Sequence, residues 1–474
     1  MPDPNRWKAL AIVCAAFFMT VLDVSIVNVA LPSIGKALHF SEANLQWVIT
    51  AYAITFGGFL LLGGRAADLL GRRRVFYVGV MVFTVASFLC GLAWSEGVLI
   101  GARALQGLGA AIISPAALSI ITTSFEEGPE RNKALGIWGA IGGSGAAVGV
   151  LAGGLLTKYL GWEWIFFVNV PVGALALLLA PRFVRESRSD REQTPDVAGA
   201  VTITAGLALL VYGVSEAPNK GWTSGQTILV LVAAAALLIA FLVVESRVKD
   251  PLMPFRIFSV HTVAGANVAG LLLGAVVFAN FFLLTLYVQN VLHWSALKTG
   301  LTFIATAGSA VLWAGLAQAL VTRIGAKKVM ALGFIGTIAG LLWYTQIPVD
   351  GSYWPNLLPG YLLIGFALPF SFIPVSIAAL AGVEQHEAGL ASGLINTAQQ
   401  VGGAIGVAIT SSVLLTHSNT LLKEGKQFPD AFTSGTRWAF WVTVGIAIAG
   451  LVATLVLIQD KEIATVEQPA PAPG

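Results

Sequence analysis

The chain has 474 residues, of which 56% are hydrophobic and only 11% are charged, and its mean hydropathy is +0.81. A soluble domain carries roughly 25% charged residues, so this chain lacks the charge to cover several soluble surfaces. The composition predicts a polytopic membrane protein and argues against a soluble enzyme or a nucleic-acid-binding protein. The formal net charge of +3 is too small to indicate a polyanionic partner.

Apolar runs predict fourteen membrane spans, because a bilayer core needs about 20 apolar residues per helix. The predicted spans cover residues 8–31, 45–64, 74–93, 97–122, 134–157, 163–181, 196–215, 226–244, 261–288, 297–322, 328–346, 356–381, 387–415 and 437–458. The first is too long for the apolar part of a signal peptide, so we expect an uncleaved helix. The loops assigned to the cytoplasm hold most of the 27 Lys and Arg residues. This bias predicts a protein of the cell membrane with both termini cytoplasmic.

An internal repeat organises these spans. Small residues of the fifth span recur in the same order and spacing in the thirteenth, where Gly136, Gly145, Ala147, Gly149 and Val150 correspond to Gly393, Gly402, Ala404, Gly406 and Val407. The basic loop at residues 71–73 has a weaker counterpart at residues 325–328. The first six spans therefore align with the last six, and the seventh and eighth are an insert.

The predicted fold is an all-α membrane protein with two six-helix bundles plus two inserted transmembrane helices. We expect an N-terminal half at residues 1–194, an insert and linker at 195–258, and a C-terminal half at 259–460. A Pro- and Ala-rich tail at 461–474 is expected to be disordered in the cytoplasm. Two halves around a midplane site are typical of secondary transporters.

Several kinds of chemistry are not indicated. The two cysteines, Cys14 and Cys90, lie in apolar runs and are expected to be small buried side chains. The sequence has neither the phosphate-binding loop of an ATP-driven pump nor a H-E-x-x-H zinc motif. We therefore expect no cofactor and no metal, and any energy must come from an ion or solute gradient.

Two charged residues fall inside predicted spans. At 1.5 Å per residue, Asp23 lies roughly 22 Å from the inner boundary and Arg103 roughly 9 Å from the outer one, in a core about 30 Å thick. The two charges thus reach similar depths, and each costs on the order of 3 kcal/mol in mid-membrane. The carboxyl group of Asp23 suits a proton carrier, and Arg103 can bias it. A permanent pair that only fixes helix packing is the structural alternative.

Two further motifs concern helix ends and helix contacts. The loop after the second span contains the candidate gating residues Gly64, Asp68, Gly71, Arg72 and Arg74. Its basic residues anchor the loop to the cytoplasmic side, and Asp68 can pair with a base or cap a neighbouring helix. The fifth span carries Gly145, Gly149, Gly153 and Gly154, which predict close helix packing and, as a further hypothesis, a seal between the halves.

These motifs, in this order, resemble the major facilitator superfamily, in its fourteen-span drug:proton antiporter branch. The resemblance runs over nearly the whole chain and rests on residues 22–32 (LDVSIVNVALP), 47–52 (WVITAY), 64–74 (GRAADLLGRRR), 99–107 (LIGARALQG) and 162–173 (WEWIFFVNVPVG). It implies the major facilitator fold and links Arg103 to proton coupling. Three positions depart from the branch pattern: Leu69 replaces a basic residue, Val150 replaces a proline, and Glu163 replaces an arginine. The missing proline weakens the inference of antiport.

The resemblance implies a proton-coupled antiporter that exports amphipathic cationic or neutral drugs by alternating access, with a small molecule, protons and the lipid bilayer as partners and a monomer as the working unit. Polar residues expected to line the substrate cavity are Asn28, Gln106, Asn280, Gln289 and Gln318. Asp23 is the only acidic residue well inside a span, so a monocation or neutral compound fits better than a dication. A dedicated exporter of one endogenous metabolite or natural product is the main alternative. Nutrient uniport or symport and a non-transporting receptor or scaffold are further ones.

Overall fold

The computed structural model describes residues 4–125, 129–188, 196–249, 251–253, 255–381 and 388–459. Every regular element in these ranges is helical, as the composition predicted. The elements are α1 (Arg6–Ala37), α2 (Glu42–Leu45), α3 (Trp47–Leu70), α4 (Arg72–Gly91), α5 (Glu96–Ser124), α6 (Pro129–Tyr159), α7 (Trp164–Phe167), α8 (Asn169–Phe183), α9 (Val197–Lys220), α10 (Gly225–Arg247), η1 (Phe255–Ser259), α11 (His261–Leu286), η2 (Tyr287–Val291), α12 (Ala296–Ile324), α13 (Ala326–Tyr344), η3 (Tyr353–Leu357), α14 (Leu358–Ala379), α15 (Ala388–Lys423) and α16 (Phe428–Leu457).

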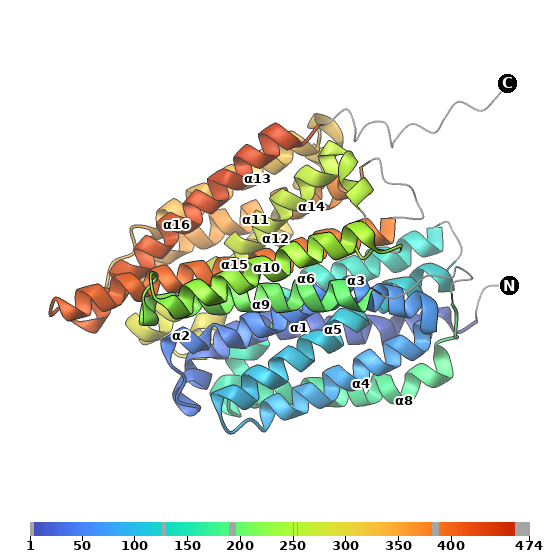
Figure 1. Cartoon of the computed structure of the whole chain (residues 1–474), viewed down its shortest axis with the longest axis horizontal. Coiled ribbons are helices and arrows are strands. Elements are labelled where there is room, and N and C mark those ends of the chain that lie inside the picture. The colour runs from blue at the N-terminus through green and yellow to red at the C-terminus, as the bar shows by residue number, and fades with distance from the viewer. Residues whose placement is uncertain are drawn as a thin grey trace. The chain divides into compact units, whose positions relative to one another are not determined.

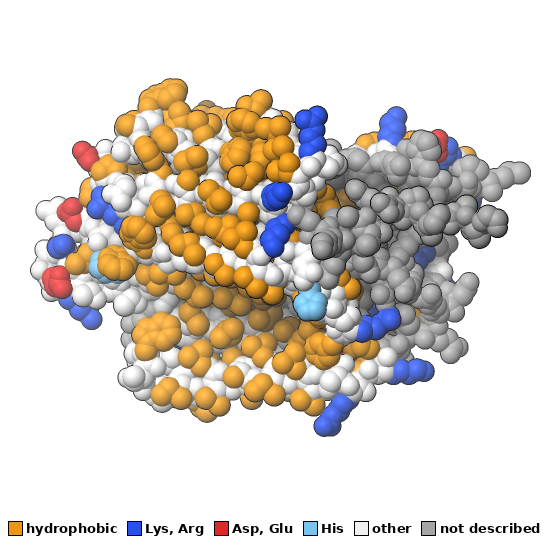
Figure 2. Space-filling model, turned by 90° about the horizontal axis from the view of Figure 1, so that it is seen from above, with side chains coloured by type: hydrophobic (Ala, Val, Ile, Leu, Met, Phe, Trp, Pro, Cys, Tyr) orange, Lys and Arg blue, Asp and Glu red, His pale blue; other side chains and the backbone are white. Residues whose placement is uncertain are grey.

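The number of membrane-spanning helices agrees with the sequence prediction. In the described part of the chain, 13 helices are long and apolar enough to cross a bilayer. The fourteenth is α6, a continuous helix of 31 residues whose described apolar stretch is Val148–Tyr159. Several helices extend beyond the predicted spans because their polar ends continue past the apolar core. In the face shown in Figure 2, a broad hydrophobic band separates charged side chains toward the two ends.

Contacts between residues divide the chain into two compact units. Unit 1 comprises residues 1–252 and 284–304, and unit 2 comprises residues 253–283 and 305–474. Within each unit the long helices run alongside one another (Figure 1). The division into two halves and an insert, which the repeat predicted, describes the chain order and stays a prediction. The predicted tail at 461–474 lies outside the described residues.

In unit 1, α1 packs against α5, α6 and α8, and α4 packs against α5 and α8. A close approach joins α1 to α6. A Cβ atom added at Gly149 would overlap the hydroxyl of Ser25, and one added at Gly153 would lie 2.6 Å from the carbonyl oxygen of Ile26. The glycines therefore let the two backbones approach to a distance that no side chain would permit.

Unit 2 contains an equivalent contact between α11 and α15. A Cβ atom added at Gly402 would overlap the carbonyl oxygen of Leu271, and one added at Gly406 would lie 2.5 Å from Cα of Ala275. Gly402 and Gly406 are the positions that the sequence repeat aligns with the fifth-span glycines. The repeat is therefore visible in helix packing as well as in sequence.

The repeat also marks two helix junctions. Gly71 separates α3 from α4 with φ of 105°, and Gly325 separates α12 from α13 with φ of 90°. Side chains other than glycine rarely adopt this left-handed backbone. Each glycine thus ends one spanning helix and starts the next without a long loop.

Helices α9 and α10 pack against each other, and α9 also packs against α3. A Cβ atom added at Gly58 of α3 would overlap the hydroxyl of Thr204 on α9. Only 17% of the most apolar part of α10 is buried. The two helices of the predicted insert are therefore held on unit 1 through α9, while α10 presents an apolar surface suited to lipid.

Candidate functional site: a buried ion pair in unit 1

The two intramembrane charges meet inside unit 1. Asp23 lies on α1 and is 0% exposed, and Arg103 lies on α5 and is 1% exposed. Nη1 of Arg103 donates a hydrogen bond to Oδ2 of Asp23 in an ion pair. The pair is therefore closed off from solvent on every side in this conformation.

Neutral amide groups donate hydrogen bonds to the other oxygen of the carboxylate. Nε2 of Gln106 donates to Oδ1 of Asp23 at 2.8 Å, and Nδ2 of Asn169 donates to the same atom at 3.3 Å. Both amides also donate to the hydroxyl of Ser87 at 3.0 Å. That hydroxyl in turn donates to the carbonyl oxygen of Phe166 at 3.0 Å. Four helices, α1, α4, α5 and α8, thus contribute side chains to one network around Asp23.

Arg103 has partners besides Asp23. Its Nε donates to the carbonyl oxygen of Val48 at 2.8 Å, and its Nη1 donates to Oε1 of Gln106 at 2.6 Å. The guanidinium carbon lies 4.4 Å from the centroid of the Tyr52 ring. A planar cation over an aromatic face is attracted by the electrons of the ring. The guanidinium is therefore held by α1, α3 and its own helix at once.

In this arrangement, a change in the charge of Asp23 would change the stability of the ion pair. A buried ion pair is strongly destabilised when one partner loses its charge, because the other charge is left without compensation. Arginine does not release its proton in proteins, so the carboxyl group is the member of the pair that can change. Proton uptake at Asp23 would leave Arg103 charged and buried, which favours a rearrangement of α1 relative to α5.

The loop motif between α3 and α4 is organised by a carboxylate from the segment that follows α8. Glu186 accepts backbone hydrogen bonds from Arg73 at 3.1 Å and Arg74 at 3.2 Å. A Cβ atom added at Gly71 would lie 2.6 Å from Oε1 of Glu186. Backbone N–H groups at a helix N-terminus favour such an anion. The side chain of Asp68, which was predicted to pair or cap here, lies outside the described part of the structure.

Other residues of the loop motif also have partners in unit 1. The backbone N–H of Arg72 donates to the carbonyl oxygen of Ser187 at 2.9 Å. Arg65 donates to the carbonyl oxygen of Pro251, so the end of α3 is tied to the segment that follows α10. Gly64 faces Pro115 of α5, with a contact at 3.4 Å for an added Cβ atom. The motif therefore connects α3 and α4 with the chain after α8 and the chain after α10.

The second part of the fifth-span motif faces α12. A Cβ atom added at Gly154 would lie 3.0 Å from the carbonyl oxygen of Ala296, and one added at Gly300 would lie 2.7 Å from that of Val150. Val150 is the position at which the branch pattern has proline. The motif glycines therefore pack on both sides of α6, against α1 and against the first turns of α12.

Of the predicted cavity residues, three lie in unit 1 and two in unit 2. Nδ2 of Asn28 donates to the carbonyl oxygen of Val24 at 2.9 Å, and Nε2 of Gln289 donates to that of Val29 at 2.8 Å. Gln106 belongs to the network around Asp23. In unit 2, Asn280 is 2% exposed and its side-chain oxygen has no partner among the described residues, whereas Gln318 is exposed on α12.

The structure adds residues that the sequence did not single out. Ser87 and Asn169 complete the Asp23 network, and their one signal in the sequence is a polar side chain within an apolar run. At the ends of α9 and α10, Asp196 and Glu245 are 4% and 3% exposed. Asp196 caps α9 by accepting from the N–H of Gly199 at 2.7 Å. Asp23 is therefore not the only buried carboxylate, although these two lie at helix ends.

Comparison with known proteins decides the family. Residues 13–407 match the family described as the Major Facilitator Superfamily. The chain belongs to the Major Facilitator Superfamily. It is a multi-pass membrane transporter and not an enzyme. The Asp23 network therefore lies in unit 1 of a transporter.

Relatives and solved structures agree with this assignment. The chain is 41% identical to the puromycin resistance protein of Streptomyces alboniger over 460 residues, which cover 96% of this chain and 91% of that protein. It is also 41% identical to the cephamycin export protein of Amycolatopsis lactamdurans over 410 residues, which cover 85% and 84% of the two chains. A bacterial homolog of the human lysosomal transporter Spinster, in an inward-facing and unoccupied conformation, superposes with a TM-score of 0.68 at 16% identity, covering 99% of this chain and 100% of that one. This last likeness shows a shared fold.

Proposed function

We propose that this protein is a proton-coupled antiporter that exports amphipathic drugs or natural products across the cell membrane, with both termini in the cytoplasm. The observation that carries the proposal is the fully buried ion pair of Asp23 and Arg103, which Gln106 and Asn169 surround with hydrogen bonds. Placing charged side chains inside a membrane-spanning bundle costs free energy, so such a pair indicates a functional role. The export direction is suggested by relatives that are named for resistance and export.

In the proposed cycle, Asp23 is the proton carrier. A proton from outside neutralises its carboxylate, and the uncompensated charge of Arg103 then favours the conformation in which the guanidinium finds other partners. Release of the proton inside restores the pair. The coupling is limited by the difference in proton affinity of Asp23 between the two conformations. Substrate and proton then favour opposite states, as antiport requires.

We propose that the α3–α4 junction controls the opening of the transporter on its cytoplasmic side. Glu186 binds the backbone N–H groups of Arg73 and Arg74, while Arg65 binds the chain after α10. Each of these contacts joins the α3–α4 junction to a segment from elsewhere in unit 1. Contacts of this kind can hold one conformation and break in another.

A dedicated exporter of one natural product is the second candidate. Several relatives carry the name of a single compound, such as puromycin, cephamycin and lincomycin. Another relative, from Mycobacterium tuberculosis, is named a multidrug resistance protein. Both candidates use the same proton site, so the number of exported compounds separates them.

The test is ethidium efflux from cells that express the protein, with and without a protonophore, in the wild type and in Asp23→Asn. Glu163→Gln is the matched control, because it removes a carboxylate that has no part in the network. We expect efflux to collapse with the protonophore and in Asp23→Asn, at equal amounts of protein in the membrane, and to persist in Glu163→Gln. Efflux that persists in Asp23→Asn and still collapses with the protonophore would refute the role of Asp23. Absence of ethidium efflux, together with export of one compound such as puromycin, would support the dedicated exporter.

A further inference from the structure

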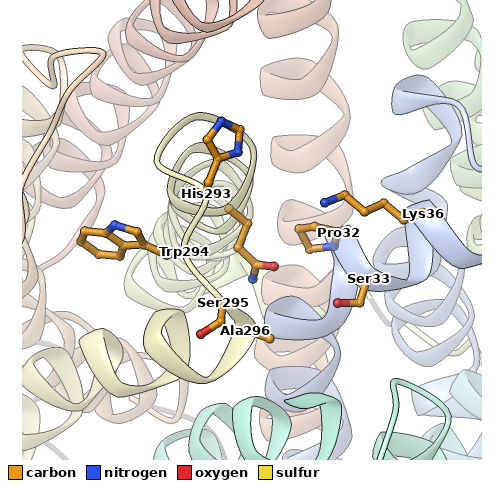
Figure 3. A pocket seen from close by; sticks show the side chains of 8 residues that line it. Pro32, Ser33, Lys36, His293, Trp294, Ser295 and Ala296 are labelled. Atoms are coloured by element: carbon orange, nitrogen blue, oxygen red, sulfur yellow. The ribbon is translucent and has the colours of Figure 1, made fainter.

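A small polar pocket lies in unit 1, where α1 ends and the chain passes from η2 into α12. Its volume is about 250 Å³. The lining residues are Pro32, Ser33 and Lys36 from α1, Gln289 from η2, and His293, Trp294, Ser295 and Ala296 from the connection to α12. Figure 3 shows the Lys36 and His293 side chains on opposite sides of the opening between these segments.

The polar side chains of this pocket differ in whether they have hydrogen-bond partners. The Ser33 hydroxyl, the Lys36 ammonium and the His293 ring have no hydrogen bond or ion pair with the residues that the structure describes. The amide nitrogen of Gln289 donates to the carbonyl oxygen of Val29, at 2.8 Å, and this bond fixes the side chain between α1 and η2. The hydroxyl of Ser295 accepts from the N–H of Lys298 at 3.3 Å and so caps the start of α12. Two lining side chains are thus held in place, while three are available to a ligand.

The backbone that carries His293 has an uncommon conformation. His293 has φ of 53°, in the left-handed region where glycine is the usual residue at a helix end. The turn is closed by the N–H of Trp294, which donates to the carbonyl oxygen of Val288 at 3.0 Å. Residues 287–291 form a π-helix, a distortion that is frequent at functional sites. A glycine would satisfy the turn, but only histidine adds a ring to the pocket wall.

The charge of the pocket has one sign. The lining includes the lysine Lys36, and the eight lining residues include no Asp or Glu. A second lysine, Lys298, places its ammonium 4.0 Å from the centroid of the Trp294 ring. The field in the pocket therefore attracts anions and repels cations.

We propose that this pocket binds the anionic group of a small organic carboxylate. In this assignment Lys36 neutralises the carboxylate, and Ser33 and His293 donate hydrogen bonds to it. Pockets for drug-sized ligands have volumes of about 300–1,000 Å³, so this pocket accommodates one ring with its carboxylate and not a whole drug. All lining residues belong to unit 1, so binding does not depend on transport. That the pocket lies on the outer side of the membrane, where an exported compound leaves, rests on the proposed function.

A lipid headgroup phosphate shares this anionic chemistry. A carboxylate group fits a volume of about 250 Å³ that contains a single lysine, Lys36. The two sources are separated below by the lipid that surrounds the protein.

The test is saturation-transfer NMR with benzoate and its neutral analogue benzamide on the purified full-length chain in a neutral detergent. We expect saturable binding of benzoate and none of benzamide. Lys36→Gln is expected to raise the benzoate Kd about tenfold or more, as loss of one charge-assisted hydrogen bond implies. Lys36→Arg keeps the charge and is expected to retain binding, and Lys426→Gln, an exposed lysine of unit 2, is the control for loss of any surface charge.

Three results would overturn the proposal: absence of saturable benzoate binding, equal binding of benzoate and benzamide, or an unchanged Kd in Lys36→Gln. The measurement is repeated in nanodiscs of phosphatidylcholine with and without phosphatidylglycerol. Loss of benzoate binding only with phosphatidylglycerol would assign the pocket to a lipid headgroup and also overturn it. Benzoate binding by a chain that exports no ethidium would leave this site intact while the proposed function fails.

Discussion

Neutralising both members of the buried pair separates a structural role from a role in coupling. The perturbation is a cycle of Asp23→Asn, Arg103→Gln and the two together. In Asp23→Asn, Arg103 keeps its charge in a site where it is 1% exposed. Breaking a buried pair by removing one charge costs roughly 3–5 kcal/mol. Since the guanidinium retains the Val48 carbonyl, Gln106 and the Tyr52 ring, we expect the lower end, about 3 kcal/mol.

Arg103→Gln has a similar expected cost. The carboxylate of Asp23 then keeps two neutral donors, Gln106 at 2.8 Å and Asn169 at 3.3 Å, but no opposite charge. The double variant contains no buried charge, and its amides can still form hydrogen bonds with the same neighbours. Replacing a buried pair by neutral groups is often close to neutral in stability. We therefore expect the double variant to be more stable than either single variant, with a coupling free energy of about 2 kcal/mol or more.

The assays are the apparent melting temperature of the detergent-solubilised protein and ethidium efflux from cells. If the pair only fixes helix packing, the double variant regains both stability and efflux. If Asp23 carries the proton, the double variant regains stability and remains inactive, and this is the result we expect. Additive effects of the two single substitutions on stability would refute the reasoning, because they would show that the charges do not depend on each other.

Three other predictions concern packing and the cytoplasmic end. Gly149→Ala is expected to lower stability by roughly 1–3 kcal/mol through overpacking and to abolish efflux, whereas Gly308→Ala, where an added Cβ atom meets nothing within 4 Å, is expected to be neutral or stabilising; both are read as melting temperature. Glu186→Gln weakens the cap of α4 and is expected to cost about 1 kcal/mol and to slow efflux, and an unchanged efflux rate would remove this contact from the proposed gate. The hydrogen bonds from Arg6 lower the pKa of Glu130 below its ordinary 4.5, so the stabilisation from this pair is present above that value and is lost as the pH falls through the lowered pKa. Wild type and Glu130→Gln should accordingly differ in melting temperature at neutral pH and converge in acid.

The intramembrane charges were predictable because a charge in an apolar run is visible in the sequence itself. Helical rise alone brought Asp23 and Arg103 to similar depths, and the structure pairs them. Their neutral partners were not predictable in the same way. Whether Asn169 faces Asp23 or lipid depends on the rotation of α8 about its axis, and each residue turns the helix by about 100°. Polarity in a span therefore identified candidates, and packing selected among them.

The same limit applies to residues that were expected in the substrate cavity. Gln106 and Gln318 are both amides in predicted spans, yet one is fully buried beside Arg103 and the other is exposed on α12. At the α3–α4 junction, glycine at position 71 and the basic residues around it predicted a tight turn. The carboxylate that caps α4 comes from Glu186, distant in sequence, and only the return of the chain after α8 to this junction reveals it. Short-range patterns thus predicted the elements, whereas long-range partners required the fold.

Helix α1 connects the features that the proposals use. Asp23 binds the charge network, Ser25 and Ile26 lie against the glycines of α6, and Val29 accepts the hydrogen bond of Gln289 at the edge of the polar pocket. These residues fall within two turns of one helix. Because the contact of α1 with α6 leaves no space for even a methyl group, a rotation of α1 caused by protonation of Asp23 must carry α6 with it or break that contact. Protonation would then reach the pocket through α1, whose Val29 carbonyl accepts the hydrogen bond of Gln289. We therefore expect a substitution at Gly149 to disturb the response of α1 to a change of charge at Asp23.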